Sequence, residues 1–172
     1  LINFTNPVSI VTEALLEHGR VKTIGLCNIP SSQRRELAAH LGVSVNVVRA
    51  AFVAAIRNKI DHVHIGAMAG KLTKMGQGLA VTHAWKAEID RDLLAECAQE
   101  VGAAPDLVEE IRAAETARFA AEKLLALGLS VEFHRALAKK AIRSLKTCYP
   151  GPYQLTLLVC DFDGKFIVRV DE

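Results

Sequence analysis

The sequence predicts an α/β protein with three layers, in which a mainly parallel β-sheet carries helices on both faces and ends in a C-terminal β-hairpin. Apolar runs of strand length alternate with amphipathic helical stretches over residues 1–68, which is typical of right-handed crossovers between parallel strands. Near the C-terminus, an Asp-Gly pair separates two apolar runs and indicates a hairpin turn. Because the chain has 172 residues, of which 51% are hydrophobic, we expect a single domain over residues 1–172 with a sizeable core.

The first 68 residues predict strands and helices in alternation. Gly19 and Gly42 follow helical stretches and end them, and Ser44 or Asn46 caps the next helix. The expected order is a strand at 1–5, a helix at 8–17, a strand at 21–27, helices at 33–41 and 46–58, and a strand at 62–68.

The remainder of the sequence is mainly helical until the hairpin. Pro105 begins a long helix that Gly128 ends, and Ser130 caps the last helix. We expect helices over about 85–101, 105–127 and 131–148, then hairpin strands at 155–160 and 166–170.

A segment rich in glycine and lysine follows the strand at 62–68. Gly66 breaks the apolar run, and Gly70 opens a helix that carries Lys71 and Lys74. Such a turn gathers backbone N–H groups and the positive end of a helix where ligands of α/β sheets usually bind. The spacing argues against a phosphate-binding P-loop, because three residues, not four, separate the glycines, and Leu72 stands where a hydroxyl is needed. The segment therefore suits an anionic, carboxylate-rich ligand.

Several motifs resemble those of one enzyme family. One motif is the run Gly-Lys-Leu-Thr-Lys-Met at residues 70–75, followed by Gly78 and by the pair Thr82-His83. This motif resembles the signature of the cobalt-precorrin-5B C1-methyltransferases of anaerobic cobalamin synthesis. Residues 115–118 resemble that family's A-x-TAR helix, residues 160–165 its closing hairpin, and residues 46–56 the helix before its strand. The likeness runs from about residue 46 to the end.

This resemblance implies methyl transfer from S-adenosylmethionine to a ring carbon of a cobalt-bound tetrapyrrole. On this interpretation Gly66 and Gly70 bind the methyl donor or carboxylates of the ligand, while no catalytic residue can be assigned. The residues that it implies for substrate binding are Lys71, Lys74, Thr82 and His83.

The first 45 residues resemble a different family. Asn-Phe-Thr-Asn-Pro at residues 3–7, Val-Thr-Glu-Ala at 11–14 and Gly-Leu-Cys-Asn at 25–28 resemble segments of the NAD- and metal-dependent 6-phospho-glycosidases. This resemblance implies an alternative function with NAD and manganese, in which Asn6 touches the substrate and Cys27 binds the metal. The boundary between the two resemblances is a seam near residues 43–46.

Composition excludes several classes of partner. A net charge of +2 argues against a general nucleic-acid coat, and no apolar run approaches the length of a transmembrane helix. No signal peptide is visible, and the four cysteines form no C-x-x-C pair, so we expect reduced thiols and a cytoplasmic protein. Residues 86–122 carry ten acidic and four basic residues, whereas 134–146 carry five basic residues and no acidic one, which indicates complementary helix faces.

Other interpretations remain open. His62 and His64 lie on one face of a strand at a spacing that suits a metal, but no third ligand is evident and no metal site is assigned. The basic side chains at residues 135–143 could instead bind an acidic ligand such as a tetrapyrrole. A third interpretation is a non-catalytic composite domain whose exposed sheet edge favours a homo-oligomer.

Overall fold

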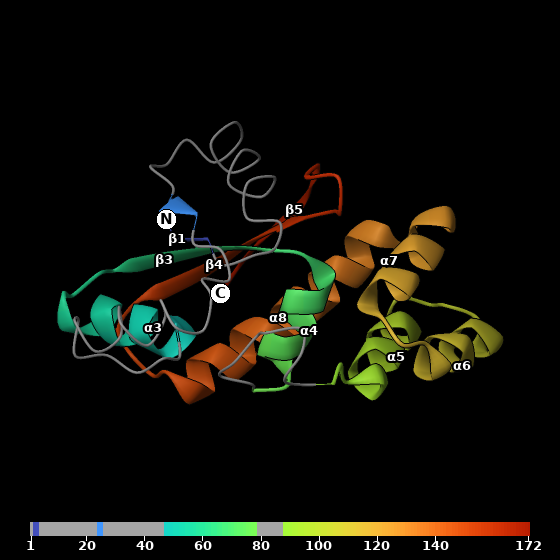
Figure 1. The fold of residues 1–172 in the computed structure, drawn as a ribbon, viewed down its shortest axis with the longest axis horizontal. Coiled ribbons are helices and arrows are strands. Elements are labelled where there is room, and N and C mark those ends of the chain that lie inside the picture. Colours follow the sequence, from blue (N-terminus) through green and yellow to red (C-terminus); the bar gives the residue numbers. More distant parts are fainter. Residues whose placement is uncertain (1, 4–23, 26–46, 79–87) are drawn as a thin grey trace, which may run out of the picture.

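The computed structural model describes residues 2–3, 24–25, 47–78 and 88–172 (Figure 1). Within these residues the protein is an α/β structure with six helices. The strands are β1 (Ile2–Asn3), β2 (Ile24–Gly25), β3 (His62–Ala67), β4 (Gln154–Cys160) and β5 (Phe166–Asp171). The helices are α3 (Val47–Arg57), α4 (Ala69–Gly76), α5 (Arg91–Glu100), α6 (Pro105–Ala113), α7 (Ala117–Ala126) and α8 (Ser130–Cys148).

A mixed three-stranded sheet in the order β3-β4-β5 forms the centre of the fold. Strands β3 and β4 pair in parallel from His62↔Gln154 to Ala67↔Val159, and β5 returns antiparallel to β4 as the predicted hairpin. Strands β1 and β2 form a separate parallel pair. The mainly parallel, three-layer sheet therefore stays a prediction, and the helices expected at 8–17 and 33–41 lie outside the described residues.

The hydrophobic core lies between one face of this sheet and α8, which runs alongside the strands (Figure 1). Alternate strand residues point to this face, as the two-residue period of a strand requires. Residues at helical spacing on α8 meet them. The fully buried contributors from the two sides are Leu155, Leu157, Val159, Phe133, Leu137 and Ala141.

Helix α4 packs closely among its neighbours because small residues allow the approach. A Cβ added at Gly76 would lie 2.9 Å from Cδ2 of Leu93 on the α5 side and 3.8 Å from the backbone nitrogen of Ala141 in α8. A Cβ at Gly70 would lie 4.0 Å from Cβ of Ala117 at the start of α7. The helix that carries Lys71 and Lys74 is therefore held against three other helices.

The single helix predicted at 105–127 is wrong, because the structure contains two helices, α6 and α7. The backbone of Ala114 is extended (φ −72°, ψ 147°), and the Thr116 hydroxyl accepts a hydrogen bond from the backbone N–H of Phe119 at 3.3 Å. A threonine side chain competes for backbone N–H groups and is favoured at the N-cap over the helix interior. Thr116 therefore begins a new helix where apolar periodicity alone predicted continuity.

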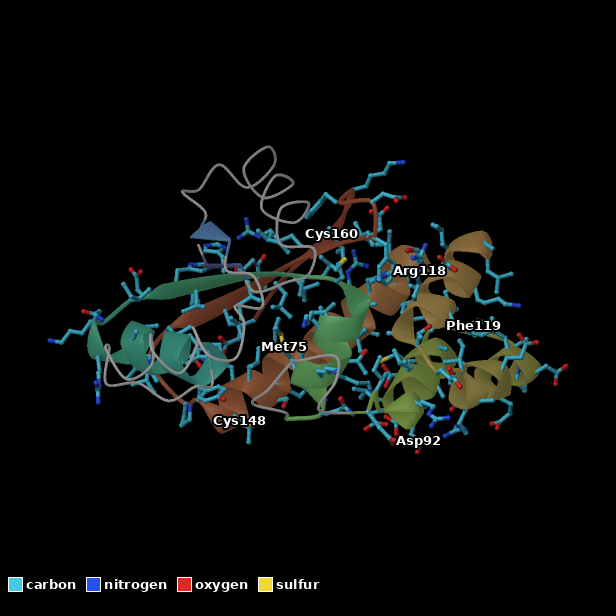
Figure 2. All side chains as sticks on the ribbon, viewed as in Figure 1. Met75, Asp92, Arg118, Phe119, Cys148 and Cys160 are labelled. Carbon is cyan, nitrogen blue, oxygen red and sulfur yellow. The ribbon has the colours of Figure 1, made fainter. Side chains whose placement is uncertain are left out.

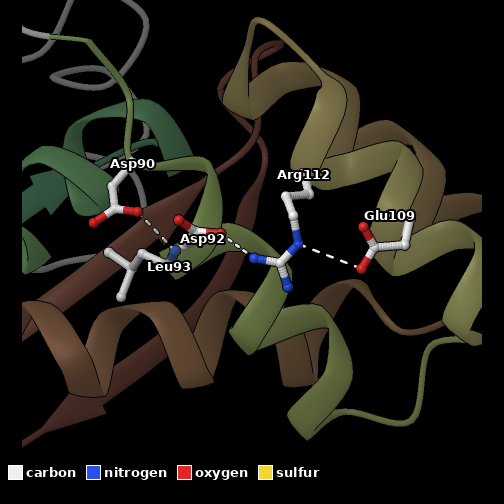
Figure 3. A network of polar contacts seen from close by, with 5 residues as sticks. All are labelled: Asp90, Asp92, Leu93, Glu109 and Arg112. Atoms are coloured by element: carbon white, nitrogen blue, oxygen red, sulfur yellow. Dashed lines mark hydrogen bonds and ion pairs between the residues drawn. The ribbon is translucent and has the colours of Figure 1, made fainter.

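Exposed ion pairs join α5 to its neighbours. Asp90 caps α5 by accepting from the N–H of Leu93 at 2.9 Å, and Asp92 pairs with Arg112 of α6 (Figure 3). On the other side, Nζ of Lys140 in α8 lies 3.2 Å from Glu96 and 2.7 Å from Glu100. The predicted complementarity of the two charged stretches is therefore confirmed at Lys140, although exposed pairs of this kind add little to stability.

Candidate functional site

The parallel strands β3 and β4 end at the same edge of the sheet. There β3 passes through Met68 into α4, and β4 passes into Asp161 at the start of the hairpin turn. In α/β proteins this is the usual position of a ligand, because strand ends and helix N-termini meet there. We call this region, residues 66–71 and 160–165 with the first turn of α7 and residues 130–134 of α8, the carboxyl edge.

The turn at the carboxyl edge differs from its prediction. Gly66 does not break the strand, because it pairs with Leu158 and β3 continues to Ala67. Met68 alone forms the turn in an extended conformation, and Gly70 is the second residue of α4, not its first. Met68 makes no side-chain cap, while its carbonyl accepts from the N–H groups of Lys71 and Leu72. The first amides of a helix have no intrahelical acceptor, so this end of α4 can donate hydrogen bonds to a ligand.

Lys71 and Lys74 lie on neighbouring positions of α4 and are both withdrawn from solvent. Lys71 is half-buried, and only 3% of Lys74 is exposed. Burial lowers the pKa of Lys74, because an apolar surrounding disfavours the charged ammonium. Both lysines make interactions within the protein. Lys74 is therefore not a solvated surface lysine, and buried lysines of this kind are frequent at functional sites.

The other predicted site residues cannot be placed. Thr82 and His83 lie in residues 79–87, and Cys27 and Asn6 lie in the N-terminal part, all outside the described residues.

Three motifs that are distant in the sequence meet at the carboxyl edge. A Cβ added at Gly70 would lie 4.0 Å from Cβ of Ala117 in the TAR motif. The next residue, Arg118, places its guanidinium carbon 5.1 Å from the ring centre of Phe162 in the hairpin turn. Arg118 also donates to Glu122 at 2.6 Å. Figure 2 labels Arg118 on α7 and Cys160 at the end of β4. Sequence order alone did not indicate this convergence.

The hairpin turn at this edge is a hydrogen-bonded loop. Oδ1 of Asp161 accepts from the backbone N–H groups of Asp163 at 2.9 Å and Lys165 at 2.8 Å. Gly164 has φ +83°, which the turn requires and which glycine adopts without strain. These contacts confirm a turn and fix the position of the Asp161 carboxylate.

His134 is a buried residue that sequence reasoning missed. Its Nδ1 lies 2.7 Å from the carbonyl oxygen of Ser130, which can only accept, so Nδ1 carries the proton and Nε2 holds a lone pair. His134 is 2% exposed, and Nε2 has no hydrogen-bond partner in the part of the chain that the structure describes. Burial lowers its pKa, while the Ser130 carbonyl and the nearby Asp161 carboxylate oppose this effect. The available signal was its helical spacing with Ala138, Ala141 and Leu145, which places a polar residue on the apolar face.

A second group of histidines lies at the opposite end of β3. The rings of His62 and His64 stack 4.4 Å apart, which confirms that they share a face of the sheet. The Thr156 hydroxyl donates to Asp171 at 2.6 Å, so it accepts from Nε2 of His62 at 3.0 Å. Burial and then the charge of His62 lower the pKa of His64. Within residues 47–78 and 88–172, no three His, Cys, Asp or Glu side chains gather as a potential metal site.

Two further expectations concern the cysteines, which were expected to be reduced, and the helices, none of which was expected to cross a membrane. Cys97, Cys148 and Cys160 are free, and burial raises the pKa of Cys97 and of Cys160 to about 12, which makes these two thiols unreactive. None of the helices in the described ranges combines the length and the apolar character that a bilayer crossing requires.

Mild acid is expected to destabilise the fold through His134 and His64. Both have a pKa below 6.5 in the folded protein, so the unfolded chain takes up protons first as the pH falls. The free energy of unfolding should therefore be lower at about pH 5.5 than at about pH 7.5, a range in which carboxylates stay ionised. Urea midpoints at several pH values measure this, and His134→Leu should reduce the slope. An equal slope in that variant would contradict the assignment to His134.

Comparisons with known proteins match two parts of the chain to two different families. The family "CbiD, C-terminal domain" matches residues 81–171, and "Family 4 glycosyl hydrolase" matches residues 1–43. The cobalt-precorrin-5B C(1)-methyltransferase of Dechloromonas aromatica is 70% identical over 125 residues, which are 73% of this chain and 32% of that protein. The protein of the same name from Polaromonas sp. is 52% identical over 122 residues, which are 71% of this chain and 33% of that protein. The one from Paracidovorax citrulli is 49% identical over 140 residues, which are 80% of this chain and 37% of that protein. The chain thus spans about a third of the length of these relatives, and no solved structure matches it.

Proposed function

Because this chain belongs to the family of CbiD C-terminal domains, we propose that it is the C-terminal part of a methyltransferase of cobalamin biosynthesis. The reaction would move a methyl group from the sulfonium of S-adenosylmethionine to a ring carbon of a cobalt-precorrin and release S-adenosylhomocysteine. The observation that carries this proposal is the 70% identity with the Dechloromonas aromatica protein. The meeting of three family-like motifs at the carboxyl edge supports it.

Methyl transfer needs orientation more than covalent help from the protein. Donor and acceptor must be held in line and close together, and fixed geometry of this kind can supply about 7–11 kcal/mol of the barrier. Helix α4 suits such a task because it is packed against α5, α7 and α8. No residue of the described part is assigned as an acid, a base or a nucleophile in this proposal.

We assign ligand-binding roles to residues at and beyond the carboxyl edge. Lys71 and Lys74 would neutralise carboxylates of the tetrapyrrole, and Thr82 and His83 would contact the same substrate. Gly66 and Gly70 would let the donor approach the backbone, with the first amides of α4 as hydrogen-bond donors. The support for Lys74 is its burial, because an ammonium held in an apolar surrounding interacts strongly with an entering anion.

The alternative function rests on residues 1–43, which match the glycosyl hydrolase family. It would require NAD and manganese, with Cys27 as a metal ligand. Manganese binding that is lost in Cys27→Ala would favour this alternative over the methyltransferase.

We also propose a cytoplasmic location and a mainly parallel sheet in the complete fold. The three free thiols among the described residues support the location. The parallel pair β3-β4 supports the sheet, because further strands of the same direction can extend it at the edge of β3. A homo-oligomer through this edge remains an alternative that light scattering tests.

A chimeric enzyme tests the proposed function directly. The segment of the Dechloromonas aromatica methyltransferase that matches this chain is replaced by the corresponding 125 residues. We expect the chimera to retain methyl transfer within about tenfold of the parent, a difference of about 1.4 kcal/mol in the barrier. Mass spectrometry of the methylated tetrapyrrole measures the product, and the parent without its C-terminal third is the negative control. A folded chimera without product would overturn the proposal.

A further inference from the structure

His134 presents a hydrogen-bond acceptor that nothing in the described structure satisfies. The Ser130 carbonyl fixes the proton on Nδ1, so Nε2 carries the lone pair, and this atom has no hydrogen-bond partner among the described residues. His134 is only 2% exposed. A buried acceptor without a partner destabilises a fold, whereas an apolar residue of similar size at the same position does not. Natural proteins break such packing rules mainly at functional sites, so an unsatisfied buried acceptor is a candidate for a ligand contact.

The Asp161 carboxylate adds a second acceptor in the same region. It lies near enough to His134 to act on its charge, and the two backbone amides that bind its Oδ1 hold it in place. Both residues belong to the carboxyl edge, where the N-terminus of α4 contributes donors rather than acceptors. The edge therefore contains two chemically different parts, one that donates to anions and one that accepts from N–H or O–H groups.

The accepting part distinguishes between the two ligands of the proposed reaction. The side chains of a cobalt-precorrin end in carboxylates, which have no hydrogen to donate when ionised and are repelled by Asp161. S-adenosylmethionine has ribose hydroxyls, an adenine amino group and an ammonium group, all of which donate. We propose that His134 Nε2 and Asp161 accept hydrogen bonds from S-adenosylmethionine. This inference rests on the proposed function, which supplies the methyl donor.

The variant His134→Leu separates a ligand-binding role from a structural one. Leucine removes the unsatisfied acceptor and keeps an apolar side chain, so the unfolding temperature should stay equal or rise. Calorimetric titration of the full chain with S-adenosylmethionine should show at least about a tenfold loss of affinity. The matched control is His64→Leu, at the opposite end of β3, which should leave affinity unchanged. A His134→Leu protein with a lower unfolding temperature and unchanged affinity would overturn the inference.

A spectroscopic measurement tests the inference without any variant. In ¹⁵N-labelled wild-type chain, the Nε2 resonance of His134 should move to lower chemical shift when S-adenosylmethionine is added, as expected for a nitrogen that gains a hydrogen bond. Binding without this change would overturn the role of His134 and leave the proposed function standing. If the chain binds no S-adenosylmethionine while the chimera transfers methyl groups, the donor site lies elsewhere and only this inference fails. Failure of both experiments would overturn the proposed function as well.

Discussion

Replacing Leu124 by alanine should lower the free energy of unfolding by about 3 kcal/mol, near the middle of the range for buried leucines. Leu124 is fully buried in the core on α7, where truncation removes apolar contacts and leaves a cavity. Since a domain of this size is stabilised by only about 5–15 kcal/mol, the variant should unfold at a clearly lower urea concentration. Chemical denaturation followed by circular dichroism measures the change.

The adjacent residue provides a matched control on the same helix. Leu125 is 61% exposed, so Leu125→Ala removes little buried surface, and alanine has the higher helix propensity. We expect its free energy of unfolding to stay within about 0.5 kcal/mol of the wild type. Equal effects at the two positions would mean that α7 does not pack against the core as described, and that the position of Arg118 at the carboxyl edge is unsupported.

The elements that sequence predicted best are those with strong local signals. Asp163-Gly164 specified the hairpin, and the apolar run from His62 specified β3, because turn chemistry and strand alternation act over a few residues. The prediction failed at Thr116, where a capping side chain outweighed apolar periodicity, and at Gly66, where pairing with β4 carried the strand past a glycine. In both cases hydrogen bonding decided the structure: the side-chain cap at Thr116 started a new helix, and the pairing of Gly66 with Leu158 continued the strand.

The candidate site was harder to predict than the fold, because it depends on contacts between distant segments. Lys71 and Lys74 could be named from the motif, but the burial of Lys74 depends on tertiary packing that spacing does not reveal. Arg118 and Phe162 meet only because α7 and the hairpin turn reach the same edge. His134 was detectable as a polar residue on an apolar helix face, yet its lone pair could be assigned only from the position of the Ser130 carbonyl.

Neutralising Lys71 and Lys74 together should weaken tetrapyrrole binding by about 100-fold or more. A hydrogen bond to a charged group contributes about 1.5–3 kcal/mol, and two such contacts correspond to a loss of this size. The variant Lys71→Gln with Lys74→Met removes both charges and keeps most of the side-chain volume. Fluorescence titration of the chain with uroporphyrin III, a polycarboxylate tetrapyrrole, measures the affinity, and the unfolding temperature shows whether the variant folds. Should Lys74→Met impair folding, Lys71→Gln alone still tests the site, with about a tenfold loss expected.

The charge-matched control lies on the exposed face of α8, where Lys139 and Arg143 offer the same change in net charge. If ligand carboxylates bind at the carboxyl edge, Lys139→Gln with Arg143→Gln should change affinity by less than about threefold, because exposed charges are screened by water and salt. A large loss in this control, with little effect at Lys71 and Lys74, would move the tetrapyrrole to the basic face of α8. Burial makes the first outcome the expected one, since an ammonium withdrawn from solvent attracts an anion more strongly than a hydrated one.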